Sequence, residues 1–151
     1  MTEKQIRKAL LQARNTYEKI RHIREHKAVL ESNRLKVTAS YSMAGGGGGG
    51  ATSKIEELTV KLLEVEEQLR LQTEEYVACL RFAENLIALL NDERHEYAAV
   101  LRMQYIDGLS RKRIAKVMNY SRVQLWRLQN KAVEILVEKT NTLEKKQKIK
   151  R

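Results

Sequence analysis

Residues 108–136, GLSRKRIAKVMNYSRVQLWRLQNKAVEIL, predict two helices joined by a tight turn. Gly108 can end a preceding helix in the left-handed conformation, and Ser110 is a favourable N-cap for the next helix. The turn around Asn119 is followed by Ser121, which is a second N-cap. This order of caps and turn is typical of a helix-turn-helix, whose second helix enters the major groove in DNA-binding proteins.

Each of the two predicted helices has an apolar face and a polar face. The apolar residues recur three or four positions apart, as expected for helices that pack on one side. They are Ile114, Ala115, Met118, Leu125, Leu128 and Ala132. The polar face of the second helix is rich in hydrogen-bond donors that suit base edges and phosphates. The segment therefore predicts a surface for sequence-directed DNA binding.

We predict two kinds of DNA contact. Arginine can pair with guanine and glutamine with adenine, whereas the start of a helix, with its free amides, favours a phosphate. The predicted base contacts are Arg122, Gln124, Arg127 and Trp126, the last of which either faces DNA or packs on Val133. The predicted backbone contacts are Ser110, Arg111, Lys112, Arg113, Lys116, Ser121, Asn130 and Lys131.

The charge distribution favours nucleic acid as the partner. The chain has 151 residues and a formal net charge of +10. Residues 1–44 carry ten Lys or Arg against four Glu, residues 45–91 four against eight, and residues 92–151 fifteen against seven acidic residues. The largest excess lies on the predicted helix-turn-helix and the tail that follows, whereas a membrane-surface protein would place it on a strongly amphipathic helix.

The composition also predicts a cytoplasmic protein. No apolar run approaches the roughly 20 residues that span a bilayer, and the first residues lack the apolar core of a signal peptide. The single cysteine, Cys79, excludes an intramolecular disulfide and fits a reducing compartment. We expect neither a membrane nor a small-molecule substrate as a partner.

Six consecutive glycines, Gly45 to Gly50, predict a flexible linker that spans residues 36–53 with its flanks. A phosphate-binding loop would need a Lys-Ser or Lys-Thr pair directly after the last glycine. Lys54 comes too late for that role. The glycines therefore separate two helices rather than bind a nucleotide.

After the glycines, the sequence has a coiled-coil periodicity. Two sets of residues recur every seven positions: Ile55, Leu62, Leu69, Tyr76, Ala83 and Leu90, and Leu58, Val65, Gln72, Cys79 and Leu86. Ile6, Leu10, Ala13, Tyr17 and Ile20 follow the same spacing before the glycines. We predict an antiparallel hairpin of a basic and an acidic helix. Apolar residues off this seam predict a second contact surface and a homo-oligomer; they are Leu63, Leu71, Leu80, Ile87 and Leu89.

A further helix is expected to begin near Asn91 and Asp92 and to run to Gly108, which completes a three-helix module. The predicted fold is therefore all-α. Residues 1–90 form the hairpin, residues 91–140 the helix-turn-helix module, and residues 141–151 a basic tail that we expect to be disordered.

Residues 97–136 resemble the fourth conserved region of bacterial sigma factors, the helix-turn-helix that recognises the upstream promoter hexamer. The matching residues are Gly108, Leu109, Ser110, Ile114, Ala115, Met118, Ser121, Leu125 and Ala132. The sigma-factor turn usually holds glycine and an aliphatic residue, whereas this chain has Asn119 and Tyr120. The regions with which sigma factors open DNA have no counterpart here, so a complete sigma factor is not expected.

The whole chain is similar to short prophage proteins of Gram-positive bacteria, which include late-gene transcription activators and autolysin-regulator-like proteins. They share a helical N-terminal half, a Tyr-Ser-x-x-Gly-rich break and a sigma-like helix-turn-helix. The break corresponds here to Tyr41, Ser42, Met43, Ala44 and Gly45. The resemblance implies transcription regulation at promoters in a bacterial host, with or without contact to host RNA polymerase.

Two other interpretations stay open. A DNA-packaging recognition subunit, like a small terminase, also joins a helix-turn-helix to oligomerising helices, and a coiled-coil adaptor would not bind DNA at all. An enzyme is not expected. His22, Glu25 and His26 match the H-x-x-E-H pattern of zinc peptidases. We nevertheless interpret them as exposed helix residues, and we expect no metal and no cofactor.

Overall fold

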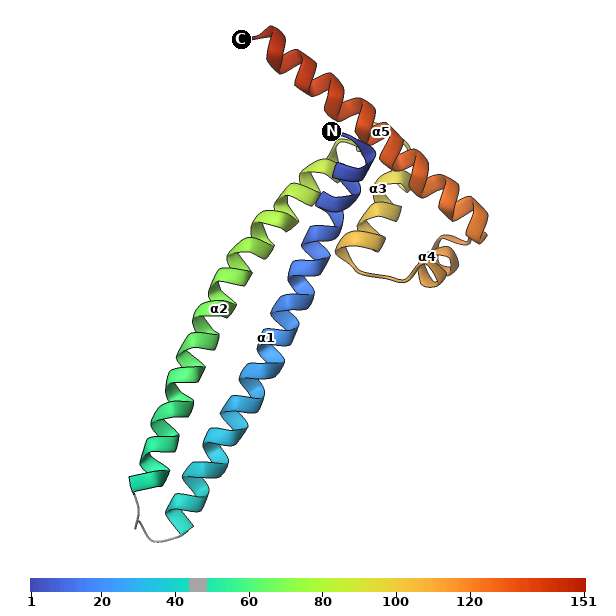
Figure 1. Cartoon of the computed structure of the whole chain (residues 1–151). Helices are drawn as coiled ribbons and strands as arrows, with labels where there is room; N and C mark the ends of the chain where they lie inside the picture. The colour runs from blue at the N-terminus through green and yellow to red at the C-terminus, as the bar shows by residue number, and fades with distance from the viewer. Residues whose placement is uncertain (44–48) are drawn as a thin grey trace. The chain divides into compact units, whose positions relative to one another are not determined.

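The computed structural model describes residues 1–43 and 49–151, and this part of the chain is helical without any strand (Figure 1). The helices are α1 (Glu3–Met43), α2 (Gly49–Ala88), α3 (His95–Leu101), the π-helix η1 (Arg102–Ile106), α4 (Arg111–Met118) and α5 (Arg122–Ile149). The predicted all-α class is confirmed. Within the described ranges, none of these helices has an apolar stretch that could cross a bilayer.

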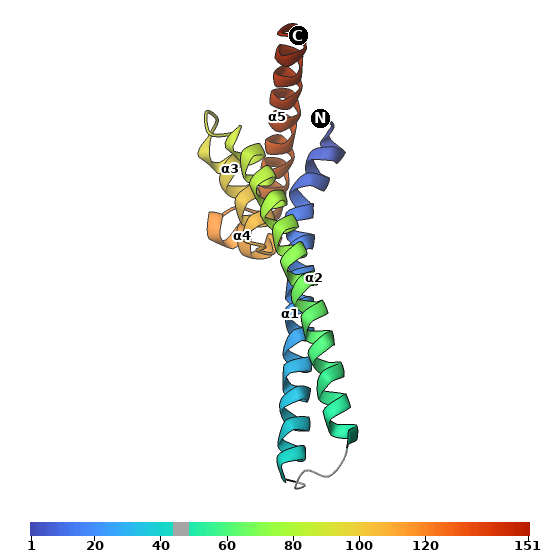
Figure 2. The ribbon, with the colours of Figure 1, turned by 90° about the vertical axis from the view of Figure 1, so that its left-hand side faces the viewer.

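Helices α1 and α2 form the predicted hairpin and lie side by side in both ribbon views (Figures 1 and 2). Lys27 Nζ of α1 lies 3.5 Å from Glu66 Oε1 of α2. Leu30 of α1 is buried in one cluster with Leu62 and Val65 of α2. The heptad spacing therefore identified the side of α2 that faces α1.

Both hairpin helices extend into the range for which the sequence predicts a linker. Helix α1 continues to Met43 and α2 begins at Gly49, so residues 36–43 and 49–53 are helical. Residues 36–43 contain no glycine or proline, and nothing in their composition stops α1. The centre of the predicted linker, residues 44–48, lies outside the described residues.

The chain divides into two compact units. The composite unit consists of residues 1–15 and 76–151, and the hairpin unit consists of residues 16–75. The sequence predicts a boundary at residue 90. The composite unit instead takes in the first turns of α1 and the last turns of α2, because their apolar side chains share its core.

The core of the composite unit draws on every helix of the chain. Its fully buried residues include Ile6, Ile87, Leu101, Ile114 and Leu136. Ile87 was predicted to belong to an exposed second surface, and this prediction is wrong because α3 to α5 supply the cover that a two-helix hairpin lacks. In the same predicted set, Leu80 and Leu89 are half-buried, whereas Leu63 and Leu71 are exposed.

The helix expected to begin near Asn91 begins later, at His95, and continues as a π-helix after Leu101. Helix α3 begins at His95, after an Arg94 cap whose side chain makes no capping hydrogen bond. Asp92 lies two residues before this cap, and its carboxylate accepts a hydrogen bond from Lys139 of α5. The last residues before the Gly108 turn form η1 instead of α-helix, and the amide of Asp107 donates to Arg102 O at 2.9 Å.

The C-terminal tail is helical, which corrects the expectation of disorder. Helix α5 continues through Leu143 to Ile149 without a break. Glutamate, lysine and glutamine favour helix, and Lys146 and Lys148 in the last turn complement the negative end of the helix dipole. The basic charge of the tail therefore lies on a helix that is continuous with the predicted recognition helix.

Candidate nucleic-acid interface

The backbone around α4 has the conformations that the sequence predicts. Gly108 has a φ of +69°, and Asn119 is left-handed with a φ of 57°. The side chain of Ser110 caps α4 by accepting a hydrogen bond from the amide of Arg113. At the other end, the amide of Tyr120 donates to Ala115 O at 2.9 Å. These local bonds fix the length of α4 and the turn into α5.

Helix α5 begins with a capping box that the sequence analysis did not identify. The Ser121 hydroxyl accepts from the amide of Gln124 at 3.2 Å, and Gln124 Oε1 accepts from the amide of Ser121 at 2.9 Å. The Ser-x-x-Gln spacing is the signal that could have revealed it. The side-chain carbonyl of Gln124 is therefore engaged inside the helix, although Gln124 itself is exposed.

The other predicted base-contacting residues lie on the uncovered side of α5. Arg122 and Arg127 are exposed, and Trp126 has an exposed fraction of 58%. Val133, the alternative partner for Trp126, is fully buried. The opposite side of the helix faces the core through Leu125 and other buried residues. The first turns of α5 thus present two arginines and an indole to solvent.

A hollow of about 330 Å³ lies between the start of α4 and the start of α5. Arg111 and Lys112 line it from α4, whereas Arg122, Trp126 and Gln129 line it from α5. Three cationic side chains therefore converge on one concave surface beside an exposed aromatic ring. Such a surface suits a polyanion that carries flat groups.

A second hollow, of about 320 Å³, lies on another side of α5. It is lined by Arg127 and Lys131 from α5 and by Arg94, Glu96 and Tyr120, among others. Arg94 Nη2 pairs with Glu96 at 2.7 Å, which offsets one of the positive charges. Burial, followed by the neighbouring Glu96 carboxylate, raises the pKa of Tyr120.

The predicted backbone-contacting cations are accessible. Arg111, Lys112 and Arg113 form the exposed first turn of α4, and Lys116 is exposed in its last turn. Lys131 of α5 is also exposed, and its Nζ lies 3.4 Å from Glu134 Oε1. The five residues present positive charge on both helices, and within the described part of the chain Lys131 is the one among them that forms an ion pair.

Asn130 is occupied by a contact that the sequence analysis missed. Its Oδ1 accepts a hydrogen bond from Arg7 Nη2 of α1 at 2.7 Å, and the contact is partly buried. The guanidinium of Arg14, also of α1, lies against Gly108 of the turn and occupies the space that a Cβ at this position would need. The first turns of α1 thus support both α5 and the turn before α4.

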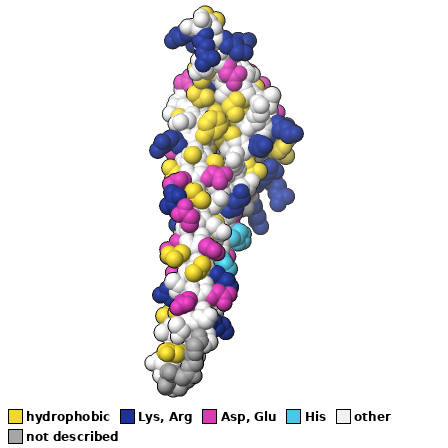
Figure 3. All heavy atoms as spheres, turned by 60° about the vertical axis from the view of Figure 1, so that its left-hand side comes forward, with side chains coloured by type: hydrophobic (Ala, Val, Ile, Leu, Met, Phe, Trp, Pro, Cys, Tyr) yellow, Lys and Arg dark blue, Asp and Glu magenta, His cyan; other side chains and the backbone are white. Residues whose placement is uncertain are grey.

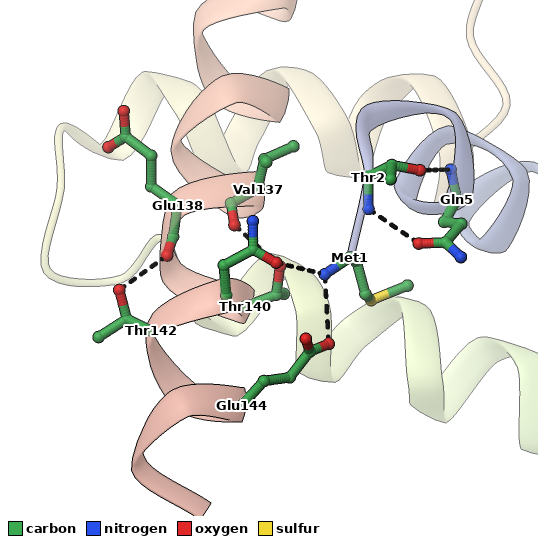
Figure 4. A network of polar contacts seen from close by, with 9 residues as sticks. Met1, Thr2, Gln5, Val137, Glu138, Thr140, Thr142 and Glu144 are labelled. Atoms are coloured by element: carbon green, nitrogen blue, oxygen red, sulfur yellow. Dashed lines mark hydrogen bonds and ion pairs between the residues drawn. The ribbon is translucent and has the colours of Figure 1, made fainter. Parts of the chain in front are cut away.

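The N-terminus ahead of α1 contacts α5 further along the helix (Figure 4). The amino group of Met1 donates to Asn141 Oδ1 at 2.7 Å and contacts Glu144 Oε1 at 3.2 Å. Thr2 and Gln5 form a second capping box at the start of α1. The spacing Thr-x-x-Gln could have been found in the sequence, but the contacts of Met1 with α5 could not.

A buried amide pair anchors α5 beneath its exposed face. Gln129 has an exposed fraction of only 3%, and its Nε2 donates to Gln104 Oε1 of η1 at 2.8 Å. An unpaired amide at this depth would be costly. Together with the apolar residues of α5 in the core, the pair favours the rotation of α5 that leaves Arg122 and Trp126 exposed.

The residues of the histidine pattern lie on an exposed part of α1. His22 Nδ1 lies 3.6 Å from Glu25 Oε2, and both side chains are well exposed. Within residues 1–43 and 49–151, the structure contains no group of three or more His, Cys, Asp or Glu side chains that could hold a metal ion. The interpretation of these residues as a solvent-facing part of α1 fits this geometry.

A known family model matches most of the chain. The sequence model of a family described as "Protein of unknown function (DUF1492)" matches residues 36–137, more than half of the chain. The matched range contains α2 to α4 and the exposed first turns of α5. No curated protein and no solved structure matches the chain.

Proposed function

The chain belongs to the DUF1492 family, and we propose that it is a sequence-directed DNA-binding transcription regulator of phage or prophage type. In this proposal α4 and α5 are a helix-turn-helix, and α5 is the recognition helix that enters the major groove. In this proposal the protein acts at promoters in the cytoplasm of a bacterial host, with or without contact to host RNA polymerase. The resemblance of residues 97–136 to the promoter-binding region of sigma factors supports this choice among DNA-binding functions.

One observation carries the proposal. The first two turns of α5 expose Arg122, Trp126 and Arg127, and the hollow beside them is lined by Arg111 and Lys112 of α4. A recognition helix needs its N-terminal turns free, together with cations on the preceding helix for the flanking phosphates. Both requirements are met in the composite unit, whose own core fixes the two helices.

The structure changes the roles that we propose for two residues. A bidentate contact to adenine uses both the carbonyl and the amino group of a glutamine. Because Gln124 Oε1 is engaged in the capping box, we propose only a single donor contact from its Nε2. Asn130 contacts Arg7, so we leave it out of the DNA contacts. Arg122 and Arg127 then carry the base recognition.

The remaining contacts follow from the exposed cations and caps. Phosphates adjacent to the groove would be held by the start of α4 and by the sides of α5. The proposed backbone-contacting residues are Ser110, Arg111, Lys112, Arg113, Lys116, Ser121 and Lys131. Because Trp126 is the one tryptophan in the chain, its indole reports directly on the proposed interface.

The test uses the intrinsic fluorescence of Trp126 in the full chain. Duplexes are first selected from a random pool, and titration of the selected duplex should shift or quench the emission. The apparent affinity should fall steeply as salt is raised. In a plot of the logarithm of the binding constant against the logarithm of the salt concentration, each neutralised phosphate should contribute about −0.9 to the slope. If the selection retains no duplex, and if the Trp126 emission does not change when duplex is added at low salt, the result would favour the adaptor interpretation instead.

Paired variants separate base contacts from phosphate contacts. Arg127→Ala should reduce discrimination between the selected and a scrambled duplex by about 1–3 kcal/mol, whereas Lys112→Ala should weaken both duplexes alike. Lys61→Ala, an exposed lysine in the hairpin unit, is the matched control and should change neither. Equal losses from Arg127→Ala on both duplexes would show that Arg127 does not contact bases. A ring of many copies on a packaging site would favour the terminase-like alternative.

A further inference from the structure

We propose that a second copy of this chain docks along the hairpin unit and completes a four-helix bundle. The dimer needs no DNA, although its consequence for the DNA site rests on the proposed function. The surface concerned is the groove face, which we define by Lys19, His22 and Ile23 of α1 and by Gln68, Leu71 and Gln72 of α2.

The groove face is a concave surface between the two helices. Its hollow has a volume of about 400 Å³. Leu71 at its edge has an exposed fraction of 49%, and Gln72 Oε1 is buried without a hydrogen-bond partner in the described part of the chain. An exposed leucine and an unpaired amide oxygen are both unfavourable in a lone hairpin. A helix laid in the groove would cover the leucine and could supply a donor.

Exposed apolar side chains continue from the groove along the hairpin. Val60 and Leu63 of α2 have exposed fractions of 55% and 61%, and Val29 of α1 is 55% exposed. Val60 precedes Leu71 by eleven residues, which is about three helical turns. Figure 3 shows hydrophobic side chains interspersed with charged ones along the hairpin, a composition that suits a helix interface with charged flanks.

The charges identify the occupant as another copy of this chain. Within the hairpin unit, residues 16–43 carry six Lys or Arg against three Glu, whereas residues 49–75 carry three against seven. The Lys27–Glu66 pair shows that the two helices already attract each other within one hairpin. A second hairpin offers the same pair of oppositely charged helices, so each basic α1 can lie against the acidic α2 of the other copy.

This matching of charges selects one symmetry. A two-fold axis parallel to the hairpin puts α1 of each copy beside α2 of the other, with all neighbouring helices antiparallel. A two-fold axis across the hairpin would instead put α1 against α1 and bring like charges together. Both chain connections leave the hairpin unit at the same end, at residues 15–16 and 75–76. If the proposed function holds, the two symmetric recognition helices then require a target with inverted-repeat symmetry.

Sedimentation equilibrium of the full chain without DNA tests the dimer. The expected result is a dimer at micromolar concentration. Leu71→Lys should raise its dissociation constant by about tenfold or more, since it removes an apolar contact and sets a cation against the basic α1. Leu143→Lys, at a leucine with an exposed fraction of 44% in the composite unit, should leave the constant unchanged. A monomer throughout the micromolar range, or equal effects of the two variants, would overturn the proposal.

Cross-linking tests the symmetry. In a Cys79→Ser background, chains with His22→Cys are mixed with chains that carry Leu71→Cys and a mass tag. The proposed arrangement gives the mixed 22–71 product, whereas 22–22 products in its place would overturn it. DNA binding by Trp126 fluorescence is measured separately. If the protein is a dimer but does not bind DNA, only the proposed function is refuted. If it binds DNA but is a monomer, only the proposed dimer is refuted.

Discussion

The composite unit and the hairpin unit share the helices α1 and α2 but differ in how far their apolar side chains are covered. In the composite unit, α3 to α5 pack around both helices, and sixteen of the described hydrophobic residues are buried in one cluster. In the hairpin unit, the buried cluster consists of Leu30, Leu62 and Val65. Two helices alone bury one stripe each, so a sequence that is apolar on more than one side needs further elements.

The difference teaches where a partner is required. The composite unit has its own core and can hold α4 and α5 in place without help. The hairpin unit leaves Val29, Val60, Leu63 and Leu71 about half exposed or more. The first unit is therefore the one expected to dominate the stability of the monomer, and the second is the one expected to respond to protein concentration.

The largest expected effect comes from removing a leucine from each core. Leu101→Ala in the composite unit should lower the free energy of unfolding by about 3–5 kcal/mol, because Leu101 is fully buried on all sides. Leu62→Ala in the hairpin unit should cost about 2 kcal/mol, since one side of its cluster is close to solvent. Urea denaturation monitored by circular dichroism at low protein concentration measures both values.

The same pair of variants can contradict the proposed difference in packing between the two units. If the hairpin unit were as fully packed as the composite unit, both substitutions would cost the same at every protein concentration. The comparison is sharpened by repeating the denaturation at higher concentration. The midpoint of the unsubstituted protein should then rise, because association stabilises the folded chain by mass action.

A smaller effect is expected at the start of α5. Ser121→Ala removes the hydroxyl that accepts from the amide of Gln124 and should destabilise the protein by about 1 kcal/mol. Ser42→Ala, in an exposed position near the end of α1 in the hairpin unit, is the control and should change stability by less than about 0.5 kcal/mol. Thermal denaturation followed by circular dichroism measures both. An unchanged Ser121→Ala variant would show that the cap does not stabilise α5.

Local patterns in the sequence predicted the local structure well. The caps at Ser110 and Ser121 and the left-handed turns at Gly108 and Asn119 depend on a few neighbouring residues, so a single sequence contains the information. The seam of the hairpin was predictable for the same reason, because a heptad repeat is a property of one helix. There are two exceptions. Leu30 is buried beyond the point where charged residues interrupt that repeat, whereas Tyr17, which the spacing assigns to the seam, is 41% exposed beside the buried Thr16.

Contacts between distant segments could not be predicted in this way. Arg7 bonds to Asn130, and Arg14 lies over Gly108, but nothing near either arginine distinguishes it from a solvated charge. Asp92 had the composition of an N-cap, yet it bonds to Lys139 on a helix that begins thirty residues later. Most residues of the predicted surface on α5 are therefore exposed as expected, whereas the part of α1 that supports this surface was not predicted.

The smallest expected effect concerns the contact between Asp92 and Lys139. The hydrogen bond from Lys139 lowers the pKa of Asp92, so this contribution to stability is complete near neutral pH and is lost as the pH falls through that pKa. The same bond raises the pKa of Lys139, which removes the contribution again in strong alkali. Asp92→Asn should therefore slightly lower the urea midpoint at pH values between these limits and leave it unchanged in acid. Asp107→Asn, at the other aspartate of the composite unit, is the control and should leave the urea midpoint unchanged. An equal fall of the midpoint in this variant would show that Asp92 has no special role in fixing α5.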